Sequence, residues 1–130
     1  SPKSPLANPK PSIATKLNVV VEKDGLEAAL KTYAQLKKNH ADEYNFAETE
    51  LNMLGYRYIA LGKKQEAVAI LKINMEQFSD SWNANDSYAD ALREDGQNEE
   101  AIKYYKRSLE LNPDNSNAIN MLKKLAPSGN

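Results

Sequence analysis

The chain has 130 residues, enough for one domain that buries an apolar core without a metal ion or a disulfide. Its 18 acidic and 17 basic side chains almost cancel, which gives no electrostatic reason to expect nucleic acid or an anionic membrane surface as a partner. Because there is no cysteine, disulfides and thiolate metal sites are excluded. No apolar run approaches the roughly 20 residues that a membrane-spanning helix needs, so we expect no membrane insertion.

The two ends of the sequence differ in composition from the part between them. Residues 1–11 hold four of the six prolines, which disfavour a helix and predict an extended linker. An ordered arm laid across the first helix is the alternative. Residues 127–130 are expected to form a short tail, and residues 12–126 a single domain.

From Ser12 onward, apolar residues recur at spacings of three and four, which predicts a series of helices. Ser12 is placed to cap the first helix, and Gly25 permits the turn to a second helix that ends before Asn39. The third is expected to begin near Asn45, in a capping box with Glu48. The third helix is predicted to end at Ala60 or Leu61, and the fourth to cover residues 64–78. The fifth should be capped by Asp80 or Ser81 and continue to Glu94 or Asp95. The sixth and the last helix are predicted over residues 98–111 and 115–125.

Residues 48–115 contain one pattern written twice with a period of 34 residues, so that Ala67 aligns with Ala101 and Gly62 with Gly96. An imperfect earlier copy places Ala29 in register with Ala67 at an offset of 38, which indicates a four-residue insertion. The fold class predicted is all-α: a right-handed stack of about three antiparallel helical hairpins. The repeats span about 10–43, 48–81 and 82–115, and a capping helix at 115–125 makes about seven helices.

The repeat resembles the tetratricopeptide repeat family. Residues 82–115 carry Ala89, Ala101, Tyr105 and Pro113 at that family's positions, and the preceding copy matches through a group that includes Leu51, Leu54, Gly55, Tyr58, Gly62 and Ala67. It departs from the family at Asn74 and Ser79. The resemblance implies a binding surface for a protein or peptide and no catalytic activity.

A narrower resemblance covers roughly residues 20–125. The run Glu50-Leu51-Asn52-Met53-Leu54-Gly55-Tyr56 and the run from Lys106 to Pro113 resemble the helical tail of some bacterial extracytoplasmic serine hydrolases, either β-lactamase-like or α/β esterases. This implies an attached or separate hydrolase domain as partner and a periplasmic or extracellular location; without it, the cytoplasm is expected. The resemblance brings no catalytic residue with it.

Catalytic patterns are absent from the sequence, which has no Gly-x-Ser-x-Gly, Ser-x-x-Lys or His-Glu-x-x-His motif. The single histidine, His40, lies in a predicted loop and cannot form a metal site by itself. We therefore expect no enzyme, no cofactor and no metal. An enzyme with an unrecognised site and a self-associating module, forming homo-oligomers, are the alternatives.

Several residues have a predicted structural role. Small residues should let paired helices approach closely: Gly55, Ala67, Ala89 and Ala101. Four tyrosines are interpreted as core aromatics whose hydroxyls reach the surface: Tyr58, Tyr88, Tyr104 and Tyr105. Asn74 is a buried amide that we expect to bond across to the next helix, with a ligand contact as the alternative.

The resemblance places the binding surface on the concave face, which the first helix of each repeat lines. The candidate partner-binding residues are Asn52, Tyr56, Ile59, Asn83, Asp86, Asp90 and Arg93. The alternative for each is a solvated helix face. The family's clamp for C-terminal carboxylates needs lysine and asparagine at positions that here hold Asn52 and Tyr56, then Asp86 and Asp90, so we do not expect a chaperone-tail adaptor.

Overall fold

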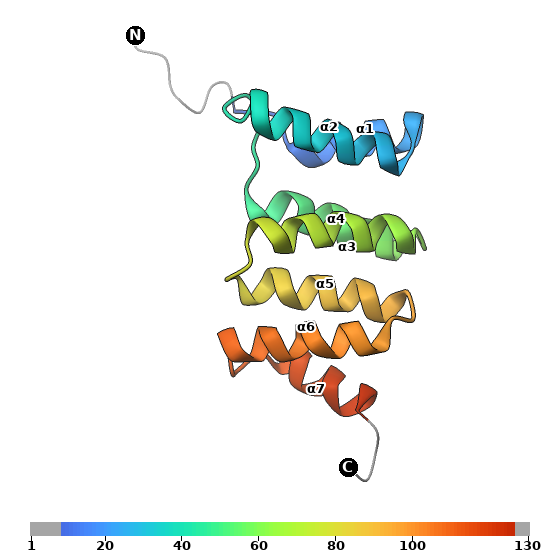
Figure 1. Ribbon diagram of the computed structural model, residues 1–130, viewed down its shortest axis with the longest axis vertical. Helices are drawn as coiled ribbons and strands as arrows, with labels where there is room; N and C mark the ends of the chain where they lie inside the picture. Colours follow the sequence, from blue (N-terminus) through green and yellow to red (C-terminus); the bar gives the residue numbers. More distant parts are fainter. Residues whose placement is uncertain (1–8, 127–130) are drawn as a thin grey trace. The chain divides into compact units, whose positions relative to one another are not determined.

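A computed structural model describes residues 9–126, and within this range the chain forms seven α-helices and no strand (Figure 1). The helices are α1 (Ile13–Asp24), α2 (Leu26–Asn39), α3 (Glu48–Ala60), α4 (Lys64–Gln77), α5 (Trp82–Glu94), α6 (Asn98–Leu111) and α7 (Ser116–Leu125). The all-α fold class is therefore confirmed. Residues 1–8 of the expected linker and the expected tail at 127–130 lie outside the described residues.

Local sequence signals account for most helix ends. Ser12 Oγ accepts the Ala14 N–H at 3.0 Å, and Ser81 Oγ accepts the Ala84 N–H at 3.1 Å, so both serines cap as expected. The turns after α3 and α5 close in the same way, around Gly62 at φ 74° and Gly96 at φ 79°. These backbone angles favour glycine, which explains why the pattern repeats it at this position.

The start of α3 differs from the expectation. The helix begins at Glu48 rather than near Asn45, because the backbone of Asn45 is held extended by the N-terminal segment. The Asn45 N–H donates to Pro11 O at 2.8 Å, and the Ile13 N–H donates to Asn45 O at 3.1 Å. The Asn45 side chain accepts the Ala47 N–H at 2.9 Å, so it caps a turn that precedes the helix.

The chain divides into two compact units, one ending at Leu51 and the other beginning at Asn52. A single domain over residues 12–126 therefore remains a prediction. The first unit holds α1 packed on α2, with Leu17 and Ala29 completely buried between them. Its connection to α3 places Phe46 edge-on to Tyr33, with ring centroids 5.7 Å apart, and under the ammonium of Lys37.

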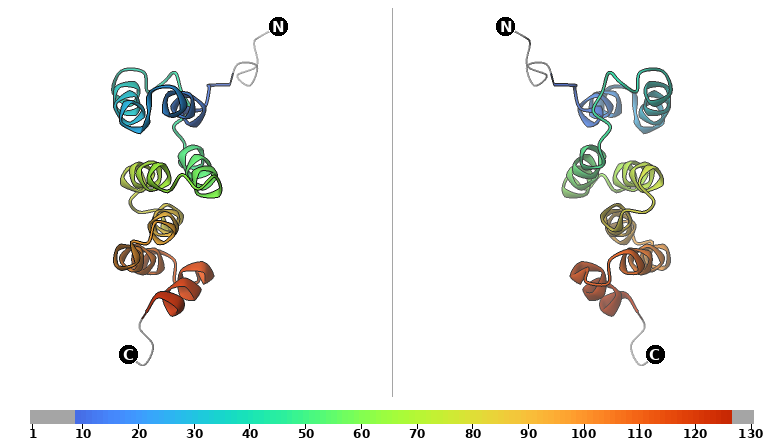
Figure 2. Two further views of the ribbon diagram at one scale, coloured as in Figure 1. Left: turned by 90° about the vertical axis from the view of Figure 1, so that its right-hand side faces the viewer. Right: turned by 90° about the vertical axis from the view of Figure 1, so that its left-hand side faces the viewer.

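In the second unit, α5 packs against both α4 and α6, and α6 against α7. Seen end-on, α4 and α6 lie in one layer and α3, α5 and α7 in the other (Figure 2). Ala67, Ala89 and Ala101 are completely buried, as predicted for small residues between helices. A Cβ at Gly55 would overlap the branched carbons of Leu71 in α4, so this glycine is required for the α3–α4 contact.

Candidate functional site

The solvent side of α3 is unusually apolar. Within the described chain, five large apolar side chains are exposed, and two of them, Met53 (60%) and Tyr56 (37%), lie on α3, with Leu61 (58%) directly after it. Met53, Tyr56 and exposed Ala60 follow at spacings of three and four, so they lie on one side of the helix. Exposed apolar side chains that gather in this way mark interaction surfaces.

Tyr56 connects this strip to α5. Its hydroxyl donates to Asp90 Oδ2 at 2.5 Å, and the two residues are 34 positions apart, at the same place in successive repeats. Asp90 itself is buried. The hydrogen bond to a carboxylate restricts the rotamers of Tyr56 and holds its half-exposed ring in one orientation on the surface.

Asp90 is also bound from α6 and from its own helix. The Tyr105 hydroxyl donates to Asp90 Oδ1, and the Nε of Arg93 donates to the Tyr105 hydroxyl oxygen at 3.1 Å. The Arg93 Nη2 lies 3.6 Å from Asp90 Oδ1. The expectation that the hydroxyls of Tyr58 and Tyr105 reach the surface is wrong, because both residues are completely buried. A buried phenol needs an acceptor, and Asp90 provides it for Tyr105.

Two asparagines of the α6–α7 region complete the cluster. Asn117 Nδ2 donates to both carboxylate oxygens of Asp86, each at 3.1 Å, and to Asp90 Oδ1 at 3.2 Å. Asn115 Nδ2 donates to Asp86 Oδ1 and to the Ser108 hydroxyl, both at 2.9 Å. We call this set the aspartate network: Tyr56, Asp86, Asp90, Arg93, Tyr105, Asn115 and Asn117.

Burial determines the protonation behaviour of the network. It raises the pKa of the Asp86 carboxyl, although the hydrogen bonds from Asn115 and Asn117 act in the opposite direction. Burial and the neighbouring Asp90 raise the pKa of the Tyr56 and Tyr105 hydroxyls well above the ordinary value. Both phenols are therefore neutral hydrogen-bond donors at physiological pH, and Asp90 is their acceptor.

The seven predicted site residues differ in accessibility. Asp86 and Asp90 are buried, Tyr56 is exposed, and the other four are half-buried: Asn52, Ile59, Asn83 and Arg93. The network brings four of the seven together. Asn52, Ile59 and Asn83 lie outside it, and Asn52 Oδ1 is buried without a hydrogen-bond partner in the described part of the chain. We call the surface of the seven residues, with Met53 and Glu94, the α3–α5 face; binding by it remains a prediction.

The sequence prediction missed Met53 and the two asparagines. Met53 is an apolar residue out of phase with buried Leu51 and Leu54, and this mismatch is a signal that sequence alone contains. Asn117 lies 34 residues after Asn83, so the repeat register could have placed it beside α5. The prediction that Asn74 is buried is correct.

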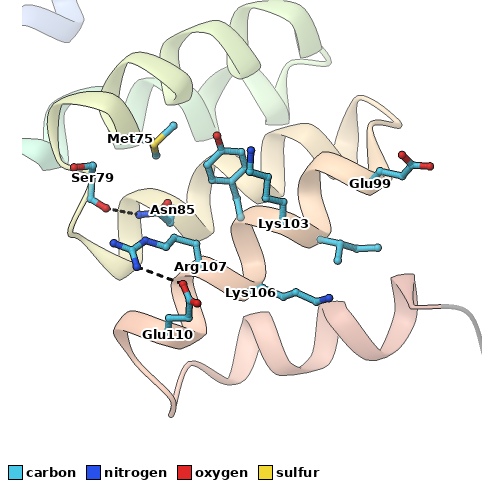
Figure 3. A pocket seen from close by; sticks show the side chains of 10 residues that line it. Met75, Ser79, Asn85, Glu99, Lys103, Lys106, Arg107 and Glu110 are labelled. Carbon is cyan, nitrogen blue, oxygen red and sulfur yellow. Dashed lines mark hydrogen bonds and ion pairs between the residues drawn. The ribbon is translucent and has the colours of Figure 1, made fainter. Parts of the chain in front are cut away.

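A second candidate lies on the other side of α5. A groove of about 680 Å³ is lined by Met75, Ser79, Asn85, Glu99, Ile102, Lys103, Tyr104, Lys106, Arg107 and Glu110 (Figure 3). Asn85 Nδ2 donates to Ser79 O at 3.1 Å, and Arg107 lies 3.3 Å from Glu110 (Figure 3). Its charged side chains are all exposed and of both signs. The groove therefore offers neither a buried reactive group nor a single sign of charge.

Neither surface has the residues of a metal site. Among the described residues, no group of three or more histidine, aspartate or glutamate side chains is placed to hold a metal ion. His40 Nδ1 lies 2.6 Å from Glu43 Oε2, but this is an isolated exposed pair. Across residues 9–126, no helix is long and apolar enough to cross a membrane.

Sequence comparison connects the second unit with a known repeat. Residues 89–122, from α5 through α6 into α7, match the family model of the TPR repeat. No curated protein matches the chain.

Solved structures resemble the chain over most of its length. The first TPR of Spaghetti (RPAP3) bound to the HSP90 peptide SRMEEVD has a TM-score of 0.60 and 23% identity, covering 87% of this chain and 86% of that one. The first TPR domain of human RPAP3 gives 0.60 and 22%, with the same coverage. MamA AMB-1 gives 0.56 and 18%, covering 87% of this chain and 60% of that chain. At these identities the likeness establishes the fold: a TPR-like all-α helical repeat.

Proposed function

We propose that this chain is a non-catalytic protein-binding module that uses the α3–α5 face. The observation that carries the proposal is the exposed strip of Met53 and Tyr56 beside the aspartate network. An aromatic side chain that is exposed but held in one orientation is a typical anchor of protein interfaces. It also loses little side-chain entropy when a partner binds, which favours affinity.

The comparison with the first TPR of Spaghetti supports a peptide as partner, because that structure holds an HSP90 peptide, SRMEEVD. The same peptide is not the ligand that we propose here. Its three carboxylate side chains would approach the half-exposed carboxylate of Glu94, and like charges across an interface are repulsive. The lysines of the family's carboxylate clamp are not present at Asn52, Tyr56, Asp86 or Asp90.

Display selection with a random peptide library, followed by fluorescence anisotropy, tests the proposal. Tyr56→Ala should weaken the selected peptides by about tenfold or more, as the loss of an interface anchor does. Lys106→Ala, in the groove between α4 and α6, is the matched control and should leave the affinity unchanged. Circular dichroism shows whether each variant is folded. If Lys106→Ala weakens binding of the selected peptides and Tyr56→Ala leaves their affinity unchanged, the binding surface is the groove and the proposal is wrong.

Self-association is a second candidate, favoured by the exposure of Met53 and Leu61. A second copy could cover these side chains as well as a different protein could. Sedimentation velocity over a range of concentrations separates the two cases. A dimer that Met53→Ser dissociates supports self-association, and a monomer at all concentrations removes it.

The chain as the tail of a serine hydrolase is a proposal that rests on the resemblance of residues 50–56 and 106–113. It identifies the partner as a domain of the same precursor or of a separate hydrolase. The full reading frame tests it directly. A precursor with a serine hydrolase domain supports the proposal. A precursor without such a domain leaves only a separate hydrolase as the partner, and fluorescence anisotropy can measure whether the chain binds one.

A further inference from the structure

The sulfur atoms of this chain belong to three methionines, because it has no cysteine. Their surroundings differ: Met53 on α3 is 60% exposed, Met75 on α4 is 8% exposed, and Met121 on α7 is half-buried. An oxidant dissolved in water reaches the thioether of Met53 directly, whereas it reaches that of Met75 only when the helices around it open. Since no thiolate competes, Met53 is the most accessible sulfur for such an oxidant.

The reaction of a thioether with hydrogen peroxide gives a sulfoxide and water. The sulfur attacks one oxygen of the peroxide, so that an S–O bond forms and the O–O bond breaks. The proton of the transferred oxygen passes to the leaving hydroxide, which becomes water. Sulfur gives up two electrons, and the peroxide accepts them. An apolar side chain thereby becomes a polar one that carries a hydrogen-bond acceptor.

The surroundings of Met53 tolerate this change. Leu51 and Leu54 supply the buried side of this turn of α3, so the Met53 side chain is not part of the core. Arg57 lies one turn further along and is exposed, and no carboxylate within residues 9–126 pairs with it. Because helical side chains lean toward the N-terminus, its guanidinium can donate to a sulfoxide oxygen one turn earlier. The oxidised side chain therefore has a donor at the surface.

Oxidation of Met53 changes the α3–α5 face and leaves the aspartate network in place. The Tyr56 hydroxyl is held by Asp90, and this hydrogen bond does not involve Met53. Met53 contributes exposed apolar surface to the strip beside Tyr56. A partner that covers this strip would have to bury the sulfoxide oxygen, and a buried polar group without a new hydrogen-bond partner weakens binding. The change thus acts on binding rather than on folding.

We propose that Met53 is a site of reversible oxidation, at which a peroxide forms the sulfoxide and lowers the affinity of the α3–α5 face for its partner without unfolding the chain. This inference rests on the proposed function, because it names a regulation of the same face. Reversal requires a methionine sulfoxide reductase and thiols: the S–O bond breaks, the oxygen leaves as water, and two thiols become a disulfide. The exposure that admits the peroxide also admits the reductase.

A time course with hydrogen peroxide on the full chain, followed by proteolysis and mass spectrometry, tests the site itself. We expect Met53 to be oxidised about tenfold faster than Met75 or more, because a buried thioether reacts only after local opening. In urea, where all three methionines are exposed, the rates should become equal. Circular dichroism should show that the chain oxidised at Met53 is folded. Oxidation of Met75 or Met121 as fast as that of Met53, or unfolding of the oxidised chain, overturns the inference.

Fluorescence anisotropy with the display-selected peptides tests the consequence for binding. The oxidised chain should bind about fivefold more weakly or worse, and treatment with a methionine sulfoxide reductase and dithiothreitol should restore the affinity. Met53→Leu keeps an apolar contact and cannot form a sulfoxide, so peroxide should leave its affinity unchanged. Met121→Leu is the matched control, because it removes the half-buried sulfur of α7 and should leave the sensitivity to peroxide as it is.

The outcomes separate the inference from the proposed function. If the oxidised chain binds as tightly as the reduced one while Tyr56→Ala weakens the peptides, the face binds partners but Met53 does not regulate it, and the inference is overturned. A loss of affinity in Met53→Leu equal to that of the unsubstituted chain overturns it as well. If no peptide is selected, or if Tyr56→Ala leaves the affinity unchanged, the proposed function fails together with the inference.

Discussion

The two sides of α5 show how one helix can border a rigid surface and a loose one. Toward α3 and α7, its carboxylates are bound by phenol and amide donors from three other segments, at Tyr56, Tyr105 and Asn117. Toward the groove between α4 and α6, the polar side chains are long and exposed, such as Lys106 and Arg107. Groups already fixed in the free protein lose less entropy on binding. The difference therefore favours the α3–α5 face as the binding surface.

The difference also has a cost in stability. α5 contributes two buried aspartates, and each buried carboxylate requires several donors to offset its loss of hydration. Arg107 forms exposed ion pairs with Asp80 and Glu110, and these charged groups stay hydrated whether or not the pairs form. Such pairs contribute little. Mutations on the two sides should thus have very different effects.

The largest effect is expected for Asp90→Ala. It leaves the hydroxyls of Tyr56 and Tyr105 and the guanidinium of Arg93 without their shared acceptor. Breaking a buried charged cluster costs about 3–5 kcal/mol of unfolding free energy. Urea unfolding measures the loss. Arg107→Ala is the control on the other side, and a comparable loss there would contradict the distinction between the two sides.

The next largest effect is expected for Gly55→Leu. It tests whether a substitution in the contact between α3 and α4 destabilises the protein as much as one in the aspartate network. A side chain at Gly55 overlaps Leu71, and overpacking of this kind costs about 1–3 kcal/mol. In a domain of this size the melting temperature should fall by several degrees, since about 1 kcal/mol corresponds to roughly 2–8 °C. Ala60→Leu introduces the same side chain at an exposed position of α3 and should leave the melting temperature unchanged.

A pair of tyrosine variants sharpens the comparison within the network. Tyr105→Phe removes a buried donor to Asp90 and should cost about 1.5–3 kcal/mol, the range for hydrogen bonds to charged groups. Tyr56→Phe removes a donor to the same carboxylate from a half-exposed ring, where solvent can replace it, and about 1 kcal/mol or less is expected. Denaturant unfolding compares them directly. Equal losses would show that exposure of Tyr56 does not matter.

The smallest effect concerns alkaline pH and the groove side of α5. Burial raises the pKa of Tyr88 to about 12, and its ring packs against Tyr104 at 4.7 Å. A phenol with a raised folded-state pKa contributes stability that is complete below its unfolded value of 10.0. That contribution is lost as the pH rises from 10.0 through about 12. In an alkaline titration followed by absorbance and circular dichroism, Tyr88→Phe should therefore shift unfolding slightly upward in pH. A downward shift would contradict the sign.

Most of the fold was predictable because its signals are local. Helix ends follow from caps such as Ser12 and Ser81 and from the glycine turn at Gly62, each of which acts within a few residues. The start of α3 was not predictable in this way. The extended backbone of Asn45 depends on hydrogen bonds with Pro11 and Ile13, which are distant in the sequence.

The candidate site shows the same limit. Repeat positions indicated that Tyr56, Asp86 and Asp90 belong to one face, and the structure brings them into one network. They could not indicate that Tyr105, from the other helix of the hairpin, buries its hydroxyl against Asp90. Side-chain pairing between helices depends on the distance at which they pack, and the sequence pattern contains no such distance.

The two asparagine contacts of the α7 region have a practical consequence for anyone who shortens this chain. The repeat by sequence ends at Asn115, but the carboxylate of Asp86 depends on the amide of Asn117 beyond it. A fragment trimmed at the repeat boundary would leave that carboxylate short of donors within the remaining helices. Truncations that remove α7 should therefore express poorly even though every complete hairpin is present. We expect the smallest fragment that folds to include Asn117, which donates to Asp86 and Asp90, rather than to end at the repeat boundary.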